Sequence, residues 1–89
     1  MTPLRQRMID DMRIRNLAPR TQEIYVRMVA DYARHFGRSP EELGPEEIRA
    51  YQLHLLREGL SISVLVQAVA ALRFLYTVTL AKPWRVSVR

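Results

Sequence analysis

Apolar residues recur every three or four positions through most of this chain, which is the spacing of amphipathic helices. After Thr2-Pro3, a helix cap followed by a first-turn proline, the first series predicts a helix that ends near Asn16. A second and wider series predicts a helix that begins at Pro19 and ends at Gly37. The apolar residues of the first series are Leu4, Met8, Ile9 and Met12, and those of the second are Ile24, Tyr25, Met28, Val29, Tyr32 and Phe36.

The middle of the chain, SPEELGPEE, carries two helix-start signals in succession. Ser39 and Glu42 match a capping box, in which each side chain bonds the other residue's backbone amide, and they predict one short turn. Gly44-Pro45 then opens a third helix, which we expect to end at Gly59. Its inward residues should be Ile48, Tyr51 and Leu55, flanked by Leu53 and Leu56.

Residues 60–81 are 22 residues long with one charge, Arg73, so their length would allow them to span a bilayer. A central arginine costs about 3 kcal/mol on insertion scales, however, and the one-sided stripes of the other helices need a partner. We therefore expect a core helix and no membrane span, with Arg73 paired to a glutamate of the third helix. Its core stripe should be Leu65, Val69, Leu72 and Tyr76, with Ile62, Ala68, Thr79 and Leu80 at the margins. The expected architecture is an all-α, four-helix orthogonal bundle.

The composition is that of one soluble globular domain, with 89 residues, 48% of them apolar and 26% charged. The chain has no cysteine, which excludes disulfides and thiolate metal sites, and two histidines are too few for a zinc site without carboxylate help. We expect no metal and no cofactor. The N-terminal residues are charged throughout and show no secretory signal, so a cytoplasmic protein is expected.

The charge is unevenly distributed along the chain. The net charge is +5, but residues 1–38 carry +4, residues 39–60 carry −3 and residues 61–89 carry +4. Lys82 is the only lysine among the 14 basic residues, and arginine suits bidentate contacts to phosphates and base edges. Two basic blocks around an acidic middle fit either a solvated mixed surface or a nucleic-acid footprint, and charge alone does not choose between them.

Two groups of residues add a more specific pattern. The first consists of Leu17-Ala18-Pro19-Arg20-Thr21, Tyr25 and Arg34-His35-Phe36-Gly37, and the second of Leu60-Ser61, Gln67, Ala70-Ala71-Leu72-Arg73 and Tyr76. Together they resemble the second and fourth helices of the N-terminal core-binding domain of tyrosine recombinases, the SAM-like domain of phage and integron integrases. The resemblance covers about residues 2–82. The stretches LRQRMIDDM, RHFGRSPEELGPEEIRAYQ and AALRFLY are especially similar to integron-type integrases and to relatives carried by mobile elements.

The resemblance implies a DNA-binding module of a larger recombinase. In such proteins this domain and a C-terminal catalytic domain clamp opposite sides of the recombination site, and a tyrosine of the catalytic domain attacks a phosphodiester. Residues 1–82 are thus expected to be the core-binding domain, and 83–89 the start of a linker to a catalytic domain that these residues do not include. The chain itself is expected not to be an enzyme. The implied partners are double-stranded DNA, that catalytic domain and further copies on DNA, in the bacterial cytoplasm and at the nucleoid when bound.

One motif imitates the catalytic cluster of this family. His35-Phe36-Gly37-Arg38 matches its H-x-x-R spelling, but Arg38 lies beyond Gly37, which should end the second helix. The two side chains would then not share a helical face, so no catalytic role is expected. The four tyrosines belong to core stripes and are not candidate nucleophiles.

The first candidate DNA contacts lie on the second helix. Arg20 and Thr21 stand in its first turn, where free backbone amides and the positive helix end favour a phosphate. Arg27 follows on the polar face of the same helix. The alternatives are that Thr21 bonds its own backbone and that Arg20 is simply solvated.

The start of the fourth helix supplies the other candidates. Ser61 and Ser63 can donate to phosphates or can cap the helix, and Gln67 can read an adenine edge.

The same segment also departs from the family. Ile62, Val64 and Val66 stand where the family usually has proline, threonine and a polar residue. These three residues either weaken the DNA contact or form a hydrophobic patch for homodimerisation, so a helical protein-interaction module is the alternative function.

Overall fold

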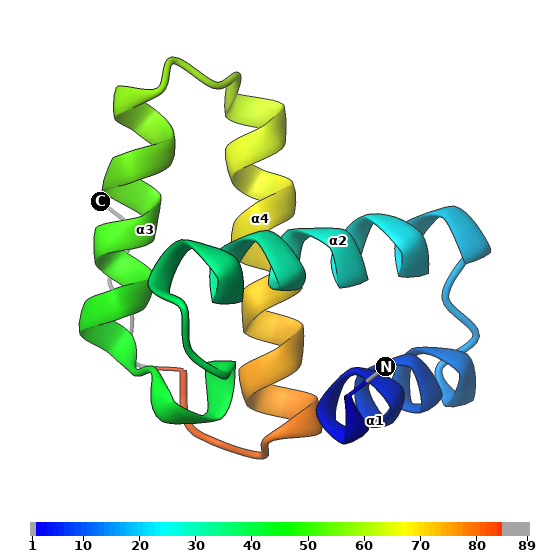
Figure 1. Cartoon of the computed structure of the whole chain (residues 1–89). Helices are drawn as coiled ribbons and strands as arrows, with labels where there is room; N and C mark the ends of the chain where they lie inside the picture. The colour runs from blue at the N-terminus through cyan, green and yellow to red at the C-terminus, as the bar shows by residue number, and fades with distance from the viewer. Residues whose placement is uncertain (1, 85–89) are drawn as a thin grey trace.

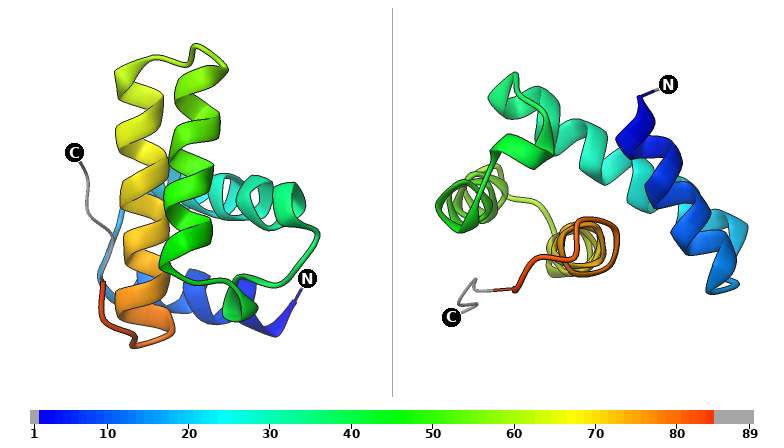
Figure 2. Two further views of the ribbon diagram at one scale, coloured as in Figure 1. Left: turned by 90° about the vertical axis from the view of Figure 1, so that its left-hand side faces the viewer. Right: turned by 90° about the horizontal axis from the view of Figure 1, so that it is seen from below.

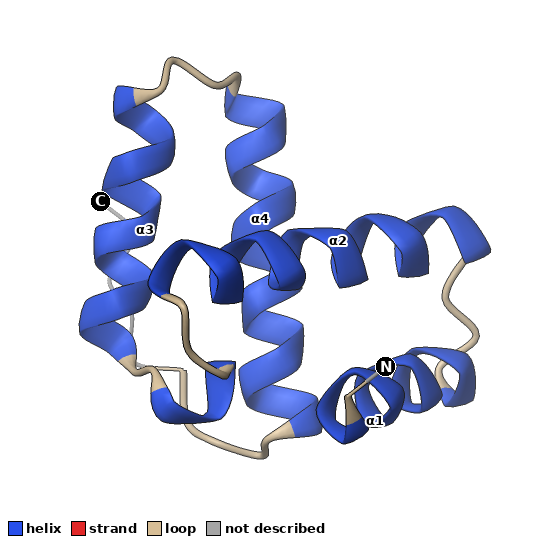
Figure 3. Cartoon of the chain, in the orientation of Figure 1, coloured by secondary structure: helices blue, strands red, loops and turns tan. Residues whose placement is uncertain are grey.

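A computed structural model describes residues 2–84, and in that range all regular secondary structure is helical (Figure 3). Figure 1 shows the four main helices: α1 (Pro3–Ile14), α2 (Pro19–Phe36), α3 (Pro45–Arg57) and α4 (Ile62–Phe74). A 3-10 turn, η1 (Pro40–Glu42), precedes α3, and α4 continues into a π-helical turn, η2 (Leu75–Thr79). The prediction of an all-α domain with four helices is confirmed.

The helices are arranged as an antiparallel hairpin with two helices packed across it. α3 and α4 form the hairpin, and α2 runs across α4 at a steep angle (Figure 1). α1 packs against α2 and against η2 at the end of α4, so that α1 and α2 lie on one side of the hairpin (Figure 2). α2 and α4 cross near their middles (Figure 1), so residues of both helices line one groove.

Local signals set the helix ends as predicted at most positions. The Thr2 side chain accepts a hydrogen bond from the Arg5 amide at 3.2 Å, and the Ser61 side chain accepts one from the Val64 amide at 3.3 Å. Gly37 ends α2 with a φ of 63°, a left-handed conformation that favours glycine. Ser61 is therefore the residue that caps α4, one of the two alternatives left open by the sequence.

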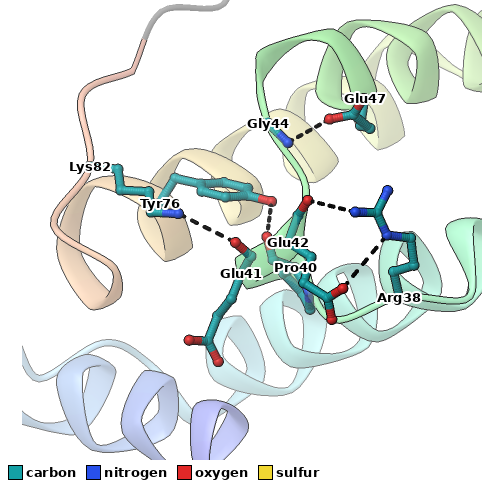
Figure 4. Close-up of polar contacts among 8 residues, drawn as sticks. All are labelled: Arg38, Pro40, Glu41, Glu42, Gly44, Glu47, Tyr76 and Lys82. Carbon is teal, nitrogen blue, oxygen red and sulfur yellow. Dashed lines mark hydrogen bonds and ion pairs between the residues drawn. The ribbon is translucent and has the colours of Figure 1, made fainter.

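The capping box predicted at Ser39 and Glu42 is wrong. The Ser39 side chain makes no capping bond, and the Glu42 carboxylate instead lies 3.8 Å from the Arg38 guanidinium (Figure 4). The carboxylate that reaches back to a helix start is that of Glu47, which accepts a hydrogen bond from the Gly44 amide at 2.6 Å. A three-residue turn such as η1 has too few free backbone amides for a capping box to bond. α3 is a full helix, whose first amides do need acceptors.

The core is centred on Tyr32, which is completely buried. Its ring makes edge contacts with the rings of Phe36, Tyr51 and Tyr76, at centroid distances of 5.5, 5.2 and 6.4 Å. These rings come from α2, α3 and η2, so one aromatic cluster joins three elements. The other fully buried large side chains are Met8, Met12, Leu72 and Leu75.

The core face of α4 differs in part from the predicted stripe. Leu72 and Tyr76 are buried as expected, but Leu65 and Val69 are only partly buried. The prediction missed Ala71 and Leu75, both completely buried. The buried face of α4 is rotated from the predicted stripe because α4 packs against both α2 and α3. In η2 the extra residue of a π turn also shifts the helical phase.

Length and composition alone would let the segment Ile62–Thr79 cross a membrane. The core helix of a soluble protein passes the same test, and here α4 and η2 contact all three other helices. Arg73 is exposed, and it forms no ion pair with any residue in the range 2–84, so the predicted pairing with a glutamate of α3 is wrong. The long Arg73 side chain remains in solvent, where an ion pair would gain little.

After η2 the chain crosses to the start of α3, where Lys82, Pro83 and Trp84 line one pocket with Gly44 and Pro45. The Lys82 amide donates to the Tyr76 carbonyl oxygen at 2.7 Å, and Trp84 packs partly buried against the core. Pro83 and Trp84 are the only residues of the predicted linker, 83–89, within the described range, and residues 85–89 lie outside it. The linker therefore stays a prediction.

Candidate nucleic-acid interface

Residues of α2 and of the α3–α4 hairpin line a groove, and Figure 1 shows how these two elements cross. The groove is lined by Arg20, Ile24, Arg27, Met28 and Asp31 of α2, by Tyr51 and Leu55 of α3, by Leu60 in the turn, and by Val64 and Gln67 of α4. Three of the six predicted DNA-binding residues, Arg20, Arg27 and Gln67, thus meet at one place. They come from two helices that are distant in sequence, and the crossing of α2 over α4 brings them together.

The groove is positively charged at its edge. Arg20 and Arg27 are exposed, and neither forms an ion pair with another residue in the described part of the chain. The one acidic residue that lines the groove, Asp31, has its carboxylate 3.0 Å from the Arg34 guanidinium. Both arginines are therefore available to an external anion, while the carboxylate is already paired.

The start of α2 has no side-chain cap, because its N-cap residue is Ala18. The first amide of this helix to bond a backbone carbonyl is that of Gln22, which donates to the Ala18 oxygen at 3.0 Å. The amides of Arg20 and Thr21 have no acceptor among residues 2–84, and neither does the Thr21 hydroxyl. Thr21 is partly buried and does not line the groove, so it lies at the margin of this surface.

The two serines at the start of α4 have different surroundings. The oxygen of Ser61 accepts the Val64 amide as the helix cap, which leaves its hydroxyl hydrogen free to donate. Ser63 is exposed, and its side chain makes no hydrogen bond within the described range. Neither serine lines the groove, although both lie within a helical turn of Val64.

The three apolar residues that depart from the family do not form one patch. Val64 is partly buried and lines the groove, whereas Ile62 and Val66 are 69% and 60% exposed. At about 100° per residue, positions two before and two after Val64 lie on the opposite side of the helix. The structure therefore places Val64 with the candidate DNA-binding residues and Ile62 and Val66 on a separate face.

The sequence did not identify the apolar floor of the groove. Ile24 and Met28 were expected to be core residues, yet both are only partly buried and line the groove with Leu60. One sign was present in the sequence, because the apolar stripe of α2 is wider than a single packed neighbour can cover. Which edge of a wide stripe stays open depends on where the other helices cross it.

The H-x-x-R motif is split between two structural environments. The His35 ring lies 4.4 Å from that of His54 and 4.7 Å from that of Phe36, measured between centroids. Arg38 lies beyond the end of α2 and donates a hydrogen bond to the Glu42 carbonyl oxygen at 3.1 Å. These contacts account for both residues as parts of the packing between α2, η1 and α3.

Three of the four tyrosines are held in the protonated form. Burial is the main cause that raises the pKa of Tyr32, Tyr51 and Tyr76 above that of free tyrosine. The hydrogen bond to Tyr76 raises the pKa of Tyr32 further. A buried phenol of raised pKa is a poor nucleophile, in agreement with the prediction that these tyrosines are core residues.

Two comparisons with known proteins, one with families and one with individual proteins, give the same result. Residues 4–86 match the family described as "Phage integrase, N-terminal SAM-like domain". Over 85 residues the chain is 51% identical to the "Putative integrase/recombinase y4qK" of Sinorhizobium fredii (strain NBRC 101917 / NGR234). The match covers 94% of this chain but 28% of that relative, so the chain spans less than a third of the relative's length. No solved structure matches significantly.

Proposed function

Because this chain belongs to the family of N-terminal SAM-like domains of phage integrases, as its motifs predicted, we propose that it is the DNA-binding module of a site-specific tyrosine recombinase. It clamps the recombination-site duplex while a separate catalytic domain integrates or exchanges the strands. The observation that best supports this proposal is the meeting of Arg20, Arg27 and Gln67 in one groove.

The two sides of the groove suit different parts of a duplex. Arg20 and Arg27 supply unpaired guanidinium groups, and the uncapped start of α2 adds free amides, all of which suit phosphate oxygens. The first turns of α4 present Gln67 in the groove and Ser63 outside it, and the exposed polar groups of both suit a base edge in the major groove. In this arrangement α2 positions the domain on the backbone and α4 faces the bases.

The chemistry belongs to the catalytic domain in this proposal. Tyr32 and Tyr76 have raised pKa values and hydroxyls that are hydrogen-bonded within the core, which supports a structural role for them. The relative from Sinorhizobium fredii carries the name of an integrase/recombinase and is much longer than this chain. We expect the complete recombinase to carry an arginine, a true H-x-x-R and a nucleophilic tyrosine after this domain, and to assemble as several copies on DNA in the cytoplasm.

Fluorescence anisotropy with a labelled duplex at low and at physiological salt tests DNA binding. Affinity should fall steeply with salt, and Arg27→Ala should reduce the slope of log K against log salt by about 0.9, the value for one phosphate contact. Arg49→Ala is the matched control, since Arg49 is also exposed but lies on α3 outside the groove. Absence of binding at low salt would rule out the proposal.

A homodimerisation module is the second candidate function, and one observation favours it. Except for Ile14, the exposed large apolar residues of the described chain all lie on the α3–α4 hairpin: Leu53, Leu56, Leu60, Ile62 and Val66. Exposed apolar residues that gather on one element are typical of protein contacts. Sedimentation of Ile62→Asp and Val66→Asp beside the unmodified chain tests this candidate. If the unmodified chain is a monomer at high concentration, the candidate fails.

A further inference from the structure

The chemistry of the groove is more specific than a general phosphate site. Its edge carries Arg20, Arg27 and Gln67, but its floor is apolar and partly open to solvent, with Ile24, Met28, Leu60 and Val64. A phosphate alone gains nothing from an apolar floor. The groove instead suits a ligand that is anionic at its borders and apolar at its centre.

We infer that Val64 and Gln67 together select an A·T base pair, Val64 through the C5-methyl group of thymine and Gln67 through the N6 and N7 atoms of adenine. This inference rests on the proposed function, because it assumes that the duplex lies against this groove. Val64 departs from the family pattern, and this inference gives it a role in DNA recognition.

Helix geometry places the two side chains suitably for one base pair. Val64 and Gln67 are three residues apart on α4, so their Cβ atoms are neighbours on one side of the helix, about 5–6 Å apart. The major-groove edge of an A·T pair presents a donor and an acceptor on adenine beside a methyl group on thymine. A glutamine amide and a branched aliphatic side chain match these two features.

The same pair of side chains disfavours a G·C pair. In the major groove that pair presents two acceptors on guanine and an amino donor on cytosine, and no methyl group. Opposite Val64, cytosine has C5–H where thymine has its methyl group, so that contact is lost, and the cytosine amino group needs an acceptor. The only carboxylate that lines the groove, Asp31, is already paired with Arg34 at 3.0 Å.

The position of Val64 separates it from its apolar neighbours on the helix. Ile62 and Val66 are more exposed than Val64, but they lie on the opposite side of α4, away from the arginines. If the β-branched residues at this helix start served only a protein contact, nothing would require one of them to line the same groove as Arg20, Arg27 and Gln67. Ile62 therefore provides a control of similar chemistry two residues away.

The test compares hairpin duplexes that differ only in the methyl group. Anisotropy is measured at low salt with alternating A·T and alternating A·U duplexes of equal length, and with alternating G·C duplexes with and without 5-methylcytosine. The unmodified chain should bind A·T about fourfold more tightly than A·U per methyl contacted, the gain expected for one buried methyl group. Methylation of cytosine should strengthen binding by a similar factor.

Variants then locate the source of the preference. Val64→Ala should remove the difference between A·T and A·U, whereas Ile62→Ala should keep it, and Gln67→Ala should reduce the preference for A·T over G·C. Circular dichroism checks that each variant is folded, and the comparison of A·T with A·U needs no variant at all. Equal binding of A·T and A·U, or a methyl preference that survives in Val64→Ala, overturns this inference and leaves the proposed function intact. Failure to bind any duplex overturns the proposed function itself.

Discussion

The hydroxyl groups of Tyr32 and Tyr76 lie 3.2 Å apart in the core, and the Tyr76 hydroxyl donates a second hydrogen bond, at 2.6 Å, to the Pro40 carbonyl oxygen. A phenol has one hydrogen, and the carbonyl can only accept, so Tyr32 must be the donor to Tyr76. These two hydrogen bonds tie α2 to η2 and to η1, and Figure 4 shows the one between Tyr76 and Pro40. The two bonds fix the loop between α2 and α3, and the position of α3 depends on that loop.

The direction of these bonds makes the two tyrosines unequal. Tyr76→Phe leaves both the Tyr32 hydroxyl and the Pro40 carbonyl without a partner in a buried place, and should lower the free energy of unfolding by about 2–3 kcal/mol. Tyr32→Phe removes one donor only and should cost about 1 kcal/mol. Urea denaturation measures both. Tyr25→Phe is the control, because the Tyr25 hydroxyl makes no hydrogen bond within residues 2–84 and should change little. Equal losses for Tyr32→Phe and Tyr76→Phe would contradict the assigned direction.

The raised pKa values of the buried tyrosines predict loss of stability at alkaline pH. A tyrosine whose pKa is higher in the folded state than the unfolded value of 10.0 keeps its proton longer when folded. The free energy of unfolding is therefore constant below pH 10.0 and falls as the pH rises above this value. Urea midpoints measured from neutral pH upward should stay level and then drop, and tyrosinate absorbance should rise together with unfolding. Ionisation of all four tyrosines in the folded protein would contradict this account.

Glu47 should stabilise the start of α3 more than its neighbour Glu46 does. The Glu47 carboxylate accepts the Gly44 amide at 2.6 Å, whereas Glu46 is exposed and makes no such bond. Glu47→Ala should lower the free energy of unfolding by about 0.5–2 kcal/mol, as expected for loss of a helix cap. Glu46→Ala removes the same charge from the same helix turn and should cost clearly less. Thermal or urea unfolding of the two variants compares them directly.

Ser61 allows capping and DNA contact to be separated. Aspartate is as good an N-cap as serine, so Ser61→Asp should keep the stability of α4 within about 0.5 kcal/mol while its negative charge repels a phosphate. Ser61→Ala should lower the stability by about 1 kcal/mol because the cap to the Val64 amide is lost. If Ser61→Asp binds duplex DNA as tightly as the unmodified chain, Ser61 is a cap and makes no phosphate contact. Urea unfolding and anisotropy on the same samples give the two readouts.

Short-range signals along the chain were enough to predict the helices and the family. Helix starts and stops depend on residues close together in the chain, such as Thr2-Pro3 and Gly37, so they could be read locally. The periodic apolar residues likewise predicted Met8, Met12, Tyr32 and Leu72 as core residues, and all four are buried. The one local error, the capping box at Ser39, arose where two helix-start signals lie within nine residues, and only one of them opens a helix long enough to need a cap.

Which residues share a surface depends on how the helices pack, and this could not be predicted from the chain. Arg20 and Gln67 meet because α2 crosses α4, and no periodicity within either helix specifies that crossing. The same crossing leaves Ile24 and Met28 open in the groove and separates Val64 from Ile62 and Val66. Which face of a helix is buried depends on its neighbours. The pattern along the chain gives the width of an apolar stripe. The packing of the other helices decides which edge of that stripe stays exposed and can bind a partner.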